Sequence, residues 1–144
     1  MGKNPQAGEV TKIYSPIQVA CGAFVGGPAG VMYFLQANFN ILEQYGMKQK
    51  TIVWGLLYLV LLTVSTPFLP ENIPNLPFTI AYVITARLVA EKYQMKKVDI
   101  IESDHYEFYS NWRVFGLGLL CLLVSFVAIL VPLLVLDATG IVTM

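Results

Sequence analysis

Charged side chains are scarce in this chain: Asp, Glu, Lys and Arg make up 12% of its 144 residues, whereas a soluble domain carries about 25%. The formal net charge of zero excludes a basic nucleic-acid binder, and the hydrophobic fraction of 56% excludes a disordered tail. With a mean hydropathy of +0.64, this composition predicts a protein that lies in a lipid bilayer. The length allows one compact unit, so we expect a single transmembrane domain over residues 1–144.

The side chains that carry most enzyme and metal chemistry are also few. Cys21 and Cys121 are the only cysteines and both lie in apolar runs, so we expect neither a disulfide framework nor a zinc site, which needs about four ligands. His105 is the only histidine, and no serine nucleophile accompanies it. The acidic residues around it are typical of a solvated loop. We therefore expect no enzyme activity, no cofactor and no resident metal.

Long apolar runs are what the sequence does have. They predict an all-α integral membrane protein with four transmembrane helices, at about residues 16–42, 52–69, 76–92 and 114–136. The third run is short, so Arg87 must extend toward the interface for it to cross. An extended connector precedes it, because a helix cannot continue through Pro67, Pro70, Pro74 and Pro77.

Glycine recurs every fourth residue in the first run, at Gly22, Gly26 and Gly30. On a straight helix these glycines form a packing stripe, with Gly27 and Pro28 beside it, where another helix of the same chain or of a second copy approaches closely. Pro28 lacks a backbone N–H and should kink the helix. The apolar stretch is about 28 Å long, so we expect a kinked crossing. The alternative is a re-entrant hairpin that turns at Gly26-Gly27-Pro28. Ser15 is a good N-cap for this helix.

The positions of Lys and Arg indicate the orientation. If all four runs cross, residues 43–50 and 91–113 share one side, which with Arg87 holds seven of the nine basic residues. This predicts cytoplasmic polar segments with both termini outside. In the re-entrant alternative the N-terminus joins the cytoplasmic side, and all nine basic residues are cytoplasmic, which fits the charge rule better.

The polar segment 93–113 is longer than the 2–8 residues or so that most helix connections take. It mixes apolar with acidic side chains and predicts a docking surface for a cytoplasmic protein partner. In the alternative, an amphipathic face of the segment lies on the lipid headgroups. The residues that we expect to dock the partner are Ile100, Ile101, Asp104, His105, Tyr106 and Tyr109.

A set of residues near the N-terminus resembles the opening of small, uncharacterised, multi-pass bacterial inner-membrane proteins. These residues are Tyr14-Ser15, Gln18-Val19, Phe24, Gly26-Gly27-Pro28, Gly30 and Asn38. The resemblance implies an inner-membrane location and several helices, and it implies no activity.

From these features we expect a non-enzymatic membrane protein that assembles or anchors a complex at a bacterial inner membrane, as a homo-oligomer or as a subunit of a larger complex. The alternative is a subunit of a small-solute or ion channel or transporter. Its path would lie at the Gly-Gly-Pro break, with Gln18 and Asn38 as its polar lining.

Overall fold

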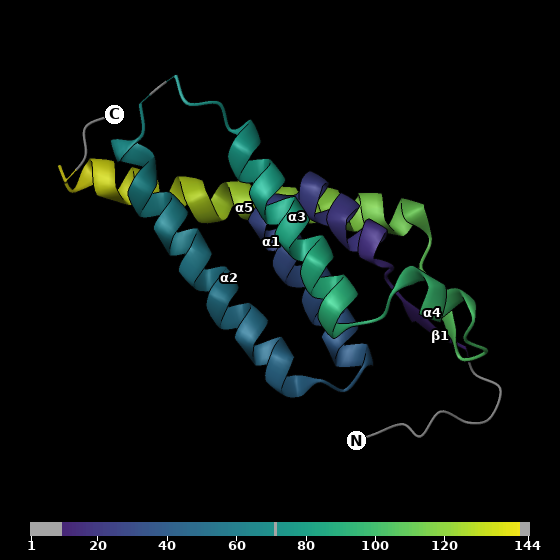
Figure 1. The fold of residues 1–144 in the computed structure, drawn as a ribbon. Helices are drawn as coiled ribbons and strands as arrows, with labels where there is room; N and C mark the ends of the chain where they lie inside the picture. Colours follow the sequence, from purple (N-terminus) through teal and green to yellow (C-terminus); the bar gives the residue numbers. More distant parts are fainter. Residues whose placement is uncertain (1–9, 71, 142–144) are drawn as a thin grey trace.

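The computed structural model describes residues 10–70 and 72–141, which are mostly helical (Figure 1). The helices in chain order are α1 (Pro16–Ile41), α2 (Tyr45–Ser65), the 3-10 helix η1 (Thr66–Phe68), α3 (Leu76–Tyr93), α4 (Lys97–Ile101) and α5 (Asn111–Ala138). Two short strands, β1 (Thr11–Ile13) and β2 (Tyr106–Phe108), pair in parallel. The expected all-α class is confirmed. Residues 1–9 of the expected domain, which include Lys3, lie outside the described residues.

Within residues 10–70 and 72–141, three helices are long and apolar enough to cross a membrane by length and composition: α1, α2 together with η1, and α5. The helix α3 is about 27 Å long at 1.5 Å per residue, but Arg87, Glu91 and Lys92 make its C-terminal part polar. The described residues thus contain three candidate membrane spans, and the expectation of four transmembrane helices is not confirmed. The expected second helix starts earlier than residue 52, at Tyr45.

The helix α1 is not straight, because the chain folds back on itself at Gly27. This residue has φ of 63° and ψ of −153°, outside the helical region. The side chain of Asn38 hydrogen-bonds to the backbone of Tyr14, although a straight helix would hold residues 24 positions apart at a distance of about 36 Å. The first arm of α1 (residues 16–26) therefore lies against the second arm (residues 28–41).

This fold-back corrects the expectation that residues 16–42 cross the membrane as one kinked helix. The arms are about 16 Å and about 21 Å long, and each is shorter than the hydrocarbon core of about 30 Å. The chain reverses here because Pro28 supplies no N–H to a continuing helix and Gly27 adopts a positive φ without a Cβ clash. The alternative geometry, a hairpin, is the one observed.

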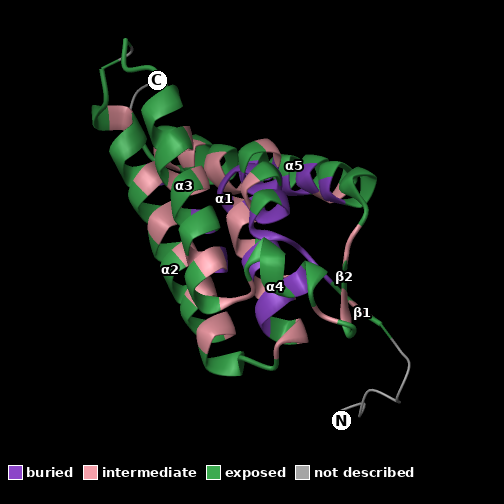
Figure 2. Cartoon of the chain, turned by 45° about the vertical axis from the view of Figure 1, so that its right-hand side comes forward, coloured by how far each residue is buried: buried purple, intermediate pink, exposed green. Residues whose placement is uncertain are grey.

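The hairpin lies at the centre of the packing, and most of the buried residues in Figure 2 belong to it. It contacts α5, α3 and α2. The small side chains of Ala86 and Ala90 bring α3 close to it, and both are fully buried. The buried core consists of Tyr14, Val19, Ala23, Phe34, Leu35, Phe39, Ala86, Ala90 and Val114.

One end of the bundle, called the polar end below, gathers residues 10–15, 42–47 and 94–110. The strand pair joins the first and last of these segments, with Thr11 opposite Tyr106 and Ile13 opposite Phe108. The backbone N–H of Gln44 donates to the carbonyl of Phe39 and so holds the turn before α2 against the second arm. The start of the described chain thus lies beside a segment about 95 residues later, as Figure 2 shows for β1 and β2.

Candidate functional site

A cluster of side-chain amides closes the open end of the hairpin. Asn38 is almost fully buried, and its Oδ1 accepts a hydrogen bond from the N–H of Tyr14 at 2.9 Å. Its Nδ2 donates to the carbonyl of Tyr14 at 2.7 Å and to Oε1 of Gln94 at 2.8 Å. Gln94 Nε2 in turn donates to the carbonyl of Leu35 at 3.0 Å. Asn38 therefore ties the segment before α1 to the second arm and to the C-terminal end of α3.

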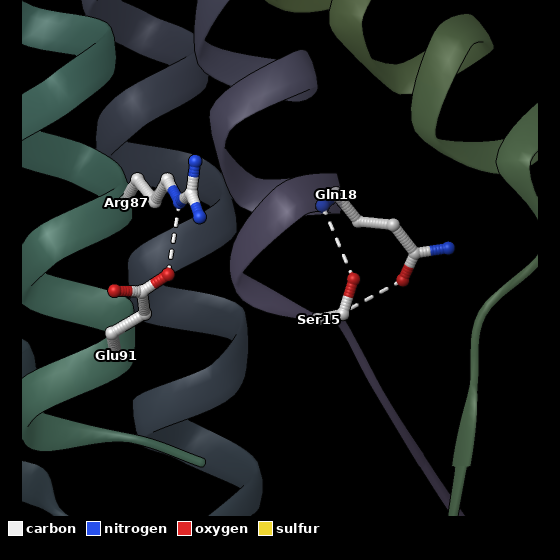
Figure 3. A network of polar contacts seen from close by, with 4 residues as sticks. All are labelled: Ser15, Gln18, Arg87 and Glu91. Atoms are coloured by element: carbon white, nitrogen blue, oxygen red, sulfur yellow. Dashed lines mark hydrogen bonds and ion pairs between the residues drawn. The ribbon is translucent and has the colours of Figure 1, made fainter. Parts of the chain in front are cut away.

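Gln18 makes the matching connection on the first arm (Figure 3). Ser15 Oγ accepts from the Gln18 N–H at 3.2 Å, and Gln18 Oε1 accepts from the Ser15 N–H at 3.1 Å, so the two form a capping box. The expected N-cap at Ser15 is confirmed. Gln18 Nε2 donates to the carbonyl of Tyr109 at 2.6 Å and to Oδ1 of Asn111 at 2.9 Å. The start of α1 is thereby fixed to the start of α5.

The sequence suggested, as an alternative, that Gln18 and Asn38 line a path for a solute or an ion. The structure places both amides in hydrogen bonds between segments of the protein, and neither lines one of the two cavities described below. Among the described residues, every buried polar side-chain atom has a hydrogen-bond partner. Both amides hold the hairpin closed.

Aromatic rings cover the amide cluster. Tyr14 is buried, meets Phe34 edge-on with ring centroids 4.9 Å apart, and stacks on Tyr109 at 4.3 Å. Arg113 lies over the Tyr109 ring at 4.8 Å, and its Nε donates to Tyr14 Oη at 3.2 Å. Burial raises the pKa of the Tyr14 phenol, while the bond from Arg113 opposes the rise. Tyr109, an expected docking residue, is thus engaged inside the protein.

At the closed end of the hairpin, Ser125 of α5 satisfies the backbone groups that the chain reversal exposes. Its hydroxyl donates to the carbonyl of Gly26 at 2.7 Å and accepts from the N–H of Ala29 at 3.0 Å. An N-terminal helix turn leaves such N–H groups without helical partners, and lipid offers none. Ser125 therefore acts as a cap supplied by another helix.

The glycines of the expected stripe contact different neighbours, because the helix that carries them is folded. A Cβ on Gly22 would overlap the ring of Phe34, and a Cβ on Gly30 would lie 2.5 Å from the carbonyl oxygen of Gly22. A Cβ on Gly26 would lie 2.7 Å from Cβ of Cys121, on a face of α5 that also presents Gly118. The close packing expected of these glycines takes place inside the chain, between the arms and against α5.

The polar segment expected to dock a partner is partly built into the fold. Ile100 is buried, which corrects its assignment as a docking residue, since a side chain 1% exposed cannot meet a partner. Ile101, Asp104 and His105 are exposed, and Tyr106 is half-buried in β2. Among the described residues, no group of His, Cys, Asp and Glu is arranged to hold a metal ion.

A groove of about 590 Å³ lies between the second arm of α1, α2 and α3. This α2–α3 groove has Lys50 and Tyr93 toward the polar end and Tyr58 and Tyr82 deeper inside. Its wall on the hairpin side is apolar and begins at the turn residue Pro28. The residues lining that side are Pro28, Val31, Met32 and Leu35.

A second hollow of about 360 Å³ lies between the first arm and α3. Arg87 lines it and forms an exposed ion pair with Glu91 at 2.9 Å, one helical turn away (Figure 3). Cys21 lines it as well and is exposed, whereas Cys121 is buried, and both are free thiols.

Sequence reasoning missed three residues that organise these features: Ser125, Gln94 and Lys50. Ser125 is the one hydroxyl on the small-residue face of α5, which is the signal that would have found it. Gln94 and Lys50 carry no such signal, because their roles depend on how α2 and α3 are placed around the hairpin. Comparisons with models of protein families, with curated proteins and with solved structures found no match to this chain.

Proposed function

We propose that the protein lies in a bacterial inner membrane with α2, α3 and α5 as spans, the α1 hairpin as a re-entrant element and the polar end in the cytoplasm. The strand pair and the amide cluster support this, because they keep residues 10–15 at the same end as residues 94–110. Residues 51–86 and 114–144 contain no Lys or Arg, so the positive charge gathers at the polar end.

Cysteine labelling tests this topology in a background with Cys21 and Cys121 replaced by alanine. In intact cells we expect an impermeant thiol reagent to label Asn72→Cys but not Lys12→Cys or Glu102→Cys. Labelling of Lys12→Cys alongside Asn72→Cys would show instead that the first run crosses. Labelling of Glu102→Cys would reverse the orientation.

Within this topology we propose a non-enzymatic function, the assembly or anchoring of a complex at the membrane. The observation that supports it best is a folded surface at the polar end, formed by β1, α4 and β2 and called the polar cap below. Bonds at residues that flank the cap hold it to the helices: Gln18 donates to the carbonyl of Tyr109, which follows β2, and Gln94, which precedes α4, bonds to Asn38 and Leu35. It nonetheless leaves Val98 58% and Ile101 62% exposed beside several carboxylates. Those carboxylates disfavour contact with an anionic leaflet and favour a protein partner.

The alternative, a channel or transporter subunit, has less support. Broken helices in transporters expose backbone groups to a substrate or ion. Here the carbonyl of Gly26 and the N–H of Ala29 are bonded to Ser125. A measurement of ion and solute flux into vesicles that contain the purified protein tests this alternative, and we expect none above empty vesicles.

A photo-crosslinking amino acid at position 101 tests the anchoring function in cells. We expect an adduct with a protein, and we expect only lipid adducts from the control position Leu123, which is exposed on α5. Lipid adducts at position 101 would show that the cap lies on the headgroups. A Gly/Ser replacement of residues 99–107 is a poorer test, because it would also remove buried Ile100 and strand β2.

A further inference from the structure

The α2–α3 groove has the depth of one lipid leaflet. On α2 its lining extends from Met47 to Tyr58, about 16 Å along the helix, and on α3 from Ala81 to Tyr93, about 18 Å. Half of the hydrocarbon thickness is about 15 Å. The volume of about 590 Å³ lies within the usual range for small-molecule sites, roughly 300–1,000 Å³.

The chemistry of the groove changes along this depth. Near the polar end the groove is lined by Lys50, an exposed cation whose ammonium group donates to no acceptor and pairs with no carboxylate among the described residues. Lys92 lies nearby over the ring of Tyr93, 5.5 Å from its centroid. Deeper in the groove the lining is mainly aromatic and aliphatic, and the Thr85 hydroxyl there donates to the carbonyl of Ala81 in its own helix. A cation beside one tyrosine, followed by a mainly apolar slot, is complementary to an amphiphile with an anionic headgroup.

Two tyrosine rings narrow the inner end of the groove. The rings of Tyr58 and Tyr82 approach each other from α2 and α3, with centroids 6.5 Å apart. Pro28 also lines the groove, from the turn of the hairpin. A transmembrane helix of a partner would need about 30 Å of continuous groove and would meet these rings about halfway. The groove is long enough for an acyl chain that enters from one leaflet.

We propose that the α2–α3 groove is a binding site for a phospholipid with an anionic headgroup, whose acyl chain fills the slot and whose phosphate pairs with Lys50. The lipid completes the packing between α2 and α3, which meet here through the Tyr58 and Tyr82 rings. Only the leaflet from which the lipid enters depends on the proposed topology. The groove and Lys50 are part of the chain in either orientation.

The test measures thermal unfolding of the purified protein in mild detergent, with lipid added at increasing concentration. We expect phosphatidylglycerol to stabilise the protein with an apparent affinity about fivefold higher than phosphatidylcholine, as one lysine near anionic lipid contributes about 1 kcal/mol. Lys50→Gln should abolish this preference. The control Lys97→Gln, which removes an exposed cation of α4 outside the groove, should retain it.

A second variant tests the acyl slot. Thr85→Phe places a ring in the groove and should weaken stabilisation by both lipids, while glycerol phosphate, which has the charge and no chain, should have no effect on the wild type. The proposal is overturned if the wild type shows no lipid preference or if Lys50→Gln and Lys97→Gln behave alike. It is also overturned if Thr85→Phe changes the oligomeric size, since a second copy would then occupy the groove. Detergent micelles impose no orientation, so a wrong topology would leave these results interpretable.

Discussion

The helices α1 and α2 are similarly apolar, but α1 lies largely inside the protein and α2 largely on its surface. In the most apolar stretch of α1, 56% of the residues are buried inside the protein, whereas the figure for α2 is 6% (Figure 2). In α1 glycines and two amides make close contacts beside buried apolar side chains such as Phe34 and Phe39, whereas Leu, Val and Ile make up 9 of the 21 residues of α2. Lipid is as apolar as leucine, so a hydrophobic side chain gains little by leaving it. In this chain, small residues and hydrogen bonds decide which helix lies inside.

The largest loss of stability is expected where a side chain would separate two backbones. Gly26→Leu places a Cβ about 2.7 Å from Cys121 Cβ and 3.1 Å from the carbonyl oxygen of Gly118. We expect it to destabilise the fold by about 3 kcal/mol or more, at the upper end of overpacking effects. Unfolding in mixed detergent micelles measures this loss.

The control for that variant is Gly116→Leu, which makes the same substitution in α5, the helix that Gly26 contacts. Apart from the backbone of its own helical turn and its chain neighbours, no heavy atom of the described residues lies within 4 Å of a Cβ built at Gly116, so we expect a change below about 0.5 kcal/mol. Equal losses in the two variants would mean that Gly26 is not a contact between α1 and α5.

The amide cluster should give the second largest effect. Asn38→Leu keeps the size of the side chain but leaves the backbone N–H and carbonyl of Tyr14 without their partners. We expect a loss of about 2–3 kcal/mol in the same unfolding assay. Asn40→Leu is the matched control, because Asn40 is exposed and its side chain accepts a hydrogen bond only from Lys48 Nζ among the described residues. If both variants are neutral, the hairpin is closed by packing alone.

Ser125→Ala should have a smaller effect, about 1–2 kcal/mol, since hydrogen bonds between membrane helices contribute from about 0.6 to 1.7 kcal/mol. It removes the partner of Gly26 and Ala29 at the turn. Ser65→Ala is its control, because within the described part of the chain that hydroxyl bonds only to the carbonyl of Leu61 in its own helix. Variants of equal stability would show that water or lipid headgroups satisfy the turn.

The difference between the two helices could be predicted only in part. The apolar runs, the cap at Ser15 and the clustering of positive charge follow from composition and local spacing. The reversal at Gly27 does not, because Gly-Gly-Pro permits both a kink and a full turn. The contacts that decide between them join Asn38 to Tyr14 and Ser125 to Gly26, residues 24 and 99 positions apart. Ile100 and Ile101 were likewise indistinguishable, since a five-residue helix is too short to show a periodicity.

The smallest effect is expected on α2, and it tests what covers that helix. Leu61 is 56% exposed and Leu35 of the hairpin is 4% exposed. Leu61→Ala exchanges one lipid contact for another, so we expect a change below about 0.5 kcal/mol, whereas Leu35→Ala opens a cavity and should lose about 2 kcal/mol or more. Unfolding of both variants in micelles and in lipid bilayer discs measures the difference. A loss at Leu61 as large as at Leu35 in either medium would mean that α2 packs against another protein chain, and its exposure in the single chain would then mark an interface between subunits.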